Sequence, residues 1–152
     1  MARFVEGFEV QGNATWSRNR LEKFTVFEGS APISLDGNTI AGFPDFLANA
    51  RATYRSGGFR VSVSLQHVGE FYSDNFQNPG KGTPDRQRTI SASTVVHAWV
   101  AFRLPLALFL KSVEVSLQAN NLFNRIYAGN GEGDEFYPAA ERNFFASLRF
   151  DL

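Results

Sequence analysis

The side chains most able to do chemistry in this sequence are arginines, carboxylates and aromatics, and none of them forms a catalytic set. Cysteine is absent, which excludes thiolate chemistry. His67 and His97 stand apart, with no carboxylate or second histidine at a spacing that would build a metal site. No serine, base or pair of carboxylates stands out as a catalytic group. The sequence therefore predicts neither an enzyme nor a bound metal or cofactor.

A Gly-rich acidic segment at 129–135 is the nearest match to an ion-binding loop. No helix is predicted after it that would supply an N-terminal dipole, and Phe136 stands where a calcium loop would need glycine. We interpret the segment as a flexible acidic loop.

Composition excludes two further classes of protein. The 15 basic and 15 acidic side chains cancel, so binding of nucleic acid through bulk positive charge is not expected. No run approaches the ~18 apolar residues of a transmembrane helix. Residues 1–10 lack the pattern of a secretory signal, so we expect any export signal to lie outside this chain. The 16 Phe and 13 Gly favour β structure with many turns.

Apolar and polar residues alternate with period two from end to end of the chain. In the stretch 59–66, for example, Phe59, Val61, Val63 and Leu65 alternate with polar residues. Strict alternation places one class of side chain on each face of a strand. Six strands are predicted, at about 7–24, 46–55, 59–74, 89–104, 113–128 and 140–152.

The connections between these strands alternate in length. Those at 56–58 and 105–112 are short, whereas those at about 25–45, 75–88 and 129–139 are long and rich in Gly, Pro, Asn and Asp. Outer-membrane barrels have short periplasmic turns and long extracellular loops, and a tilted spanning strand needs ~9–11 residues. We therefore predict an all-β, antiparallel up-and-down meander that forms an open segment of a transmembrane barrel. A small soluble β-sandwich or calyx that binds a ligand remains the alternative, because both architectures alternate.

Two sets of side chains are candidates for function. By parity, polar residues form an inward-facing wall. The members that we expect to face the lumen are Arg51, Arg55, Arg60, Arg103, Glu114 and Arg149, with Glu9 and Asp151 available as further partners at the short-turn end. The competing interpretation of this wall is a solvated face with weak ion pairs, each worth ~0–1 kcal/mol. Ligand contacts are expected at the long-loop ends, where aromatics and arginines suit an anionic or aromatic chelate. These residues are Tyr72, Phe76, Arg86, Arg88, Tyr127, Phe136 and Tyr137. The aromatics among them could instead belong to an interfacial belt.

The last forty residues resemble a known family. The stretch 113–127 (VEVSLQANNLFNRIY) is similar to the penultimate strand of TonB-dependent receptors, with its Asn-Leu-Phe-Asp/Asn-x-x-Tyr core. The stretch 137–152 (YPAAERNFFASLRFDL) resembles that family's final strand, including its Pro-x-x-x-Arg-x-Phe element. The chain ends in Leu152, whereas outer-membrane strands more often end in an aromatic residue.

The resemblance implies a plugged 22-stranded barrel, of which residues 1–152 would be a C-terminal part without plug domain or signal peptide. It implies a bacterial outer-membrane location and lipid around the barrel. The parent receptor would take up a ferric siderophore or similar scarce nutrient, with its own plug domain and TonB as partners. The polar wall would contact the plug. The barrel-assembly machinery would read alternate apolar positions of the final strand, namely Phe144, Leu148, Phe150 and Leu152.

Overall fold

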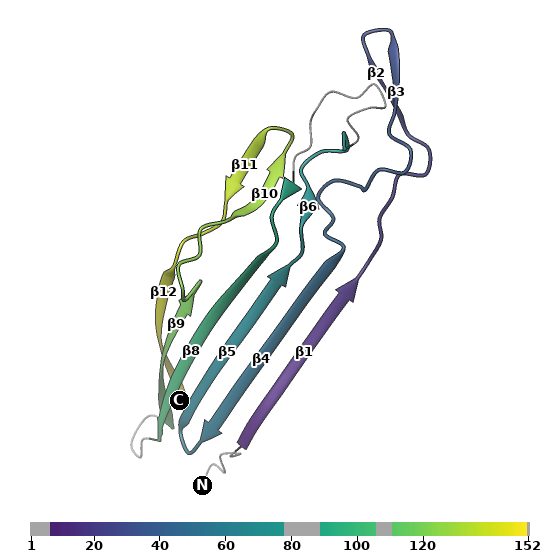
Figure 1. Ribbon diagram of the computed structural model, residues 1–152. Coiled ribbons are helices and arrows are strands. Elements are labelled where there is room, and N and C mark those ends of the chain that lie inside the picture. The colour runs from purple at the N-terminus through teal and green to yellow at the C-terminus, as the bar shows by residue number, and fades with distance from the viewer. Residues whose placement is uncertain (1–6, 78–88, 106–110, 152) are drawn as a thin grey trace.

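The large sheet of this protein is an antiparallel meander of six strands. The computed structural model describes residues 7–77, 89–105 and 111–151, which contain strands and turns. The sheet contains β1 (Gly7–Trp16), β4 (Phe46–Ser56), β5 (Phe59–Val68), β8 (Ser93–Pro105), β9 (Ser112–Asn120) and β12 (Asn143–Asp151), in that spatial order. Each strand pairs with the next large strand along the chain, and the sheet curves as in a barrel wall (Figure 1). The predicted fold class is confirmed.

Three small hairpins lie in the long connections, at the upper end of the sheet in Figure 1. They are formed by β2 (Thr25–Glu28) with β3 (Ala31–Ser34), β6 (Phe71–Tyr72) with β7 (Thr89–Ile90), and β10 (Ala128–Glu132) with β11 (Glu135–Pro138). The short-turn end lies opposite, where β1 begins and β12 ends.

The pairing register places most apolar side chains on one face of the sheet and most polar side chains on the other. Val63, for instance, lies opposite Ala52 on one side and Ala98 on the other, and Ala98 lies opposite Ala119. Apolar rows therefore cross the whole sheet, and polar rows alternate with them. Their side chains are open to the surroundings: Val63 and Leu117 are each 47% exposed.

The apolar face has no second layer in the described part of the chain, where the other sheets are the small hairpins of the long connections. A soluble sandwich or calyx would bury such a face against a second sheet or inside a closed barrel. The alternative of a small soluble binding module is therefore wrong for this fold.

Several strands are shorter than predicted. The strand predicted over 7–24 ends at Trp16, and the backbone beyond it bonds within the connection instead of along β4: the Leu21 amide donates to the Asn38 carbonyl at 2.9 Å. The strand predicted over 113–128 ends at Asn120, because Asn121 adopts a left-handed φ of 49°.

Other predicted strands are interrupted. The strand predicted over 59–74 divides into β5 and β6: the pairing with β4 ends with the bond from the Gly69 amide to the Phe46 carbonyl at 2.8 Å, and β6 pairs with β7 instead. The strand predicted over 89–104 divides into β7 and β8, and the one over 140–152 begins at Asn143. The strand predicted over 46–55 matches β4 to within one residue.

The tight turn at 56–58 is confirmed and depends on two glycines. Gly57 has φ 55°, in the left-handed region that glycine occupies without strain. A Cβ on Gly58 would lie 2.2 Å from the Arg103 carbonyl oxygen, so only glycine fits against β8 there. The Gly58 carbonyl accepts a hydrogen bond from the Arg103 amide at 2.8 Å. The turn is thereby fixed beside Arg103.

Candidate functional site

The polar face is the concave face of the sheet. Two adjoining hollows of about 380 and 500 Å³ lie on it, and both are lined by Gln11, Arg51, Ser64, His97 and Gln118. These five residues come from five different strands and all have the polar parity. We call the two hollows together the wall groove.

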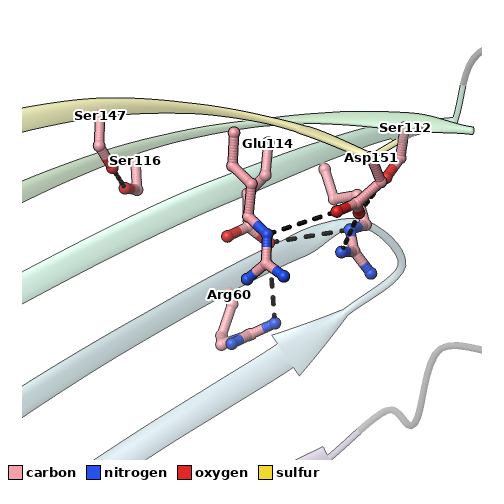
Figure 2. Close-up of polar contacts among 8 residues, drawn as sticks. Arg60, Ser112, Glu114, Ser116, Ser147 and Asp151 are labelled. Carbon is pink, nitrogen blue, oxygen red and sulfur yellow. Dashed lines mark hydrogen bonds and ion pairs between the residues drawn. The ribbon is translucent and has the colours of Figure 1, made fainter. Parts of the chain in front are cut away.

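Below the groove, at the short-turn end, lies a band of ion pairs. We define the charged band as Arg60, Arg103, Glu114, Arg149 and Asp151. Arg103 Nη2 lies 2.7 Å from Asp151 Oδ2, and its Nε lies 3.9 Å from Glu114 Oε2. Arg60 Nη2 lies 3.9 Å from the same Glu114 oxygen, and Arg149 Nε lies 3.4 Å from Asp151 Oδ1 (Figure 2).

Neighbouring groups orient the charged band. The Ser112 hydroxyl donates to Asp151 Oδ2 at 2.8 Å (Figure 2). The Arg60 guanidinium carbon lies 5.4 Å from the centre of the Trp99 ring, which is within cation–π range. The band thus joins β5, β8, β9 and β12 through side chains as well as through the backbone ladder. On the far side of the face, Glu9 and Arg55 form a separate pair at 2.6 Å.

The six wall residues singled out from the sequence, Arg51, Arg55, Arg60, Arg103, Glu114 and Arg149, all lie on this concave face. Arg51 differs from the rest, because it has no hydrogen-bond or ion-pair partner among the described residues. Contact of this face with a plug domain stays a prediction.

The final strand presents alternate apolar side chains outward. Phe144, Leu148 and Phe150 of β12 are 60%, 64% and 58% exposed and lie on the face opposite the wall groove. Leu152 lies outside the described residues. Recognition of these positions by the assembly machinery stays a prediction.

Above the groove, the long connections are bonded to one another. The Thr39 amide donates to Gln77 Oε1 at 2.8 Å, and Gln77 Nε2 donates to the Thr39 carbonyl at 2.6 Å. Asn38 Nδ2 donates to the Asn75 carbonyl at 2.7 Å. Ser73 Oγ donates to the Gly133 carbonyl at 2.9 Å. The segments 17–45, 69–77 and 121–142 therefore form one unit, which we call the loop cluster.

The residues predicted to contact a ligand do not gather at one point in the described part of the loop cluster. Phe76 lines a hollow of about 440 Å³ with Leu35, Asp74 and Glu132. Tyr127 lines a separate hollow of about 150 Å³. Tyr72 is half-buried in β6, and Phe136 and Tyr137 are 49% and 47% exposed on β11. Arg86 and Arg88 lie outside the described residues.

One of these predicted ligand residues has a perturbed pKa. The Tyr137 hydroxyl donates to Glu135 Oε2 at 3.0 Å. This hydrogen bond, and the negative charge of the same carboxylate, raise the pKa of Tyr137 above its ordinary value. Tyr137 is therefore a neutral hydrogen-bond donor at physiological pH.

Sequence reasoning missed the residues that hold the loop cluster together. Gln77 and Asn38 are buried, and their side-chain amides form hydrogen bonds with the backbone of another loop. Asn121 is buried too: its Nδ2 donates to the Arg125 carbonyl and its Oδ1 accepts from the Arg125 amide, both at 2.8 Å. Asn tolerates left-handed backbone, so the sequence could have indicated a turn at Asn121. No feature of the sequence indicated the role of Gln77.

Two searches of the described residues found nothing. They contain no helix long and apolar enough to cross a membrane. They also contain no group of three or more His, Cys, Asp or Glu side chains that could hold a metal ion.

With the fold and the two faces described, the comparisons define the class of protein. The chain belongs to the TonB-dependent receptor-like β-barrel family, whose model matches residues 3–122. This match covers the strands that pattern alone had assigned. It ends within the first of the two stretches that carried the resemblance, 113–127, and before the second, 137–152. None of the curated proteins matches the sequence.

Solved structures share the fold at low sequence identity. The siderophore receptor PiuA from Acinetobacter baumannii matches 94% of this chain with a TM-score of 0.73 and 15% identity. The ferric-catecholate import receptor Fiu from Escherichia coli K12 matches 93% with a TM-score of 0.62 and 15% identity. The unliganded ferric citrate transporter FecA matches 75% with a TM-score of 0.60 and 14% identity. This chain covers 19%, 18% and 17% of those structures, respectively, which is less than a fifth of each.

Proposed function

We propose that this chain is a C-terminal part of the wall of a TonB-dependent receptor in the bacterial outer membrane. The receptor imports a ferric siderophore or a similar scarce nutrient, and it is not an enzyme. The different chemistry of the two faces carries this proposal: a convex side that is apolar over most of its area suits hydrocarbon, and a hydrogen-bonding concave side suits a wet lumen. The family and the similar solved structures support it.

The mechanism follows from the wall. In lipid every backbone amide and carbonyl needs a partner, and the sheet ladder supplies one for each inner strand. The edges β1 and β12 each pair on one side in the described residues, so closure requires further strands of the parent receptor. A plug domain inside the closed barrel gates passage, and TonB delivers the energy to move it.

The ligand contacts of the receptor come from the loop cluster. Aromatic and polar side chains there, among them Phe76 and Tyr137, face the outside of the cell and meet the chelate before it enters the lumen. A ferric chelate that is anionic or aromatic fits these groups. It also fits Arg86 and Arg88, which belong to the same connection as Phe76. The names of the similar structures, which concern siderophores, ferric catecholate and ferric citrate, support this substrate class.

Uptake of radioactive iron tests the proposal. Deletion of the parent gene should abolish uptake of at least one chelate from a panel that includes ferric citrate and a ferric catecholate. Removal of TonB should have the same effect, and the receptor should fractionate with the outer membrane. Unchanged uptake of every chelate, or recovery of the receptor outside the outer membrane, would contradict the proposal.

A further inference from the structure

The concave face carries an excess of positive charge. Its described strand positions hold five arginines (Arg51, Arg55, Arg60, Arg103 and Arg149) and three carboxylates (Glu9, Glu114 and Asp151). The excess is therefore two positive charges. Its position on the face indicates which kind of partner supplies the missing negative charge.

The excess divides between the wall groove, where Arg51 has no partner among the described residues, and the charged band, which holds three arginines and two carboxylates. Glu9 is already held by Arg55 at 2.6 Å, and Asp151 by Arg103 at 2.7 Å. Glu114 is shared between Arg60 and Arg103, each at 3.9 Å. Arg60 is thus only weakly paired, with a side chain 44% exposed, and Arg51 is unpaired among the described residues. Both line the smaller hollow of the groove.

The spacing of these two cations favours an extended polypeptide over a compact anion. Arg51 lies opposite Ser64, and Arg60 lies four residues before Ser64 on β5. Four residues of strand correspond to ~13 Å, which is also the span of four residues in an extended segment. An occupant that runs along the strands therefore meets one cation and then the other.

The rest of the groove suits a polypeptide backbone. Gln11, Gln66 and Gln118 line it beside Ser64. A side-chain amide offers both a donor and an acceptor, as a peptide group does. Apart from Arg51, the larger hollow is lined by uncharged residues, so a charge on the occupant is matched at Arg51.

We infer that the wall groove binds an extended acidic segment of the receptor's own plug domain, with one of its carboxylates paired to Arg51. This inference rests on the proposed function, since it requires a plugged receptor. It goes further by assigning the polarity of the contact: the wall supplies the cation and the plug supplies the anion.

Carboxylate-selective cross-linking of the full receptor in outer membranes tests the inference. In an Arg51→Lys variant, a zero-length carbodiimide reagent should join the introduced amine to an Asp or Glu of the plug domain, and mass spectrometry should identify the peptide. In the matched variant Arg51→Gln, which has no amine, that product should be lost. An Arg55→Lys variant serves as the positive control, because its amine should couple to Glu9.

Two results would overturn the inference. One is that Arg51→Lys gives no carboxylate product while Arg55→Lys couples to Glu9. The other is that Arg51→Lys couples only to carboxylates within residues 7–151. Either result would leave the proposed function intact provided that the receptor still fractionates with the outer membrane and takes up its chelate.

A second measurement separates charge from size. Arg51→Glu places the introduced carboxylate beside the carboxylate of the plug, and this repulsion should loosen the plug. Cells that carry Arg51→Glu should therefore admit a large antibiotic such as vancomycin more readily than cells that carry Arg51→Gln. Equal susceptibility of the two variants would mean that no carboxylate faces this position.

Discussion

The wall and the loop cluster are both made of strands and turns, yet different interactions hold them together. In the wall, neighbouring strands pair residue for residue over eight to ten positions without a shift, and many apolar side chains stay exposed. In the loop cluster, side-chain amides bond to the backbone of distant loops, and apolar residues such as Leu35 and Phe71 are buried. The wall therefore leaves its apolar side chains uncovered in the described residues, whereas the loop cluster carries a small core of its own.

The sharpest test of this difference changes one apolar side chain of the wall. Leu117→Arg places a charge on the lipid face, where it should lower the free energy of unfolding by ~2–4 kcal/mol. Ser116→Arg, the neighbouring position on the concave face, should lower it by about 1 kcal/mol or less. Urea unfolding of the receptor in lipid vesicles measures both. Equal effects would mean that the convex face does not touch lipid.

The next largest effect is expected in the loop cluster. Gln77→Ala removes the two bonds to the Thr39 backbone and leaves a buried amide and carbonyl without their partner, which costs about 1–3 kcal/mol. Hydrogen exchange should become faster at Thr39 and its neighbours while the wall strands keep their protection. Thr25→Ala, at an exposed position of β2, is the matched control and should change neither. Faster exchange throughout β4 and β5 would show that the two regions are not separable.

A smaller effect is expected in the charged band. Glu114→Gln removes the carboxylate that faces both Arg60 and Arg103, and should lower the free energy of unfolding by about 1 kcal/mol, because these long pairs are partly exposed. Ser147→Ala, which removes only a bond to Ser116 outside the band (Figure 2), should have a smaller effect on the same urea curve. A larger loss for Ser147→Ala would contradict the band's role.

The smallest expected effect concerns the pH dependence of one hairpin. The hydrogen bond from Tyr137 to Glu135 is present below the ordinary pKa of tyrosine and is lost only as the pH rises through the raised pKa of Tyr137. Ultraviolet titration should therefore show one of the four tyrosines ionising later than the rest, and Tyr137→Phe should remove that last step. A last step that persists in Tyr137→Phe would assign it to another tyrosine.

The same difference explains what could be predicted from the sequence. The wall was predictable because alternation is local: Val61, Val63 and Leu65 identify β5 and its two faces without knowledge of any partner. The strand ends at Trp16 and Asn120 were not, since they depend on bonds to residues far along the chain or on a single left-handed residue. The hairpins of the loop cluster and the role of Gln77 depend on contacts between loops, which no periodicity records. Arg51 was predicted to lie on the wall. That it has no partner among the described residues became visible only once Glu9, Glu114 and Asp151 were assigned to other arginines.

The unshifted register of the wall has a consequence for how such a protein can change over time. A single residue inserted within β4 or β5 would exchange the two faces for the rest of that strand, turning arginines toward hydrocarbon and valines toward water. Substitutions in the wall are tolerable one at a time, but insertions and deletions are not. Changes in length are therefore expected in the long connections, where they leave the register of the wall intact.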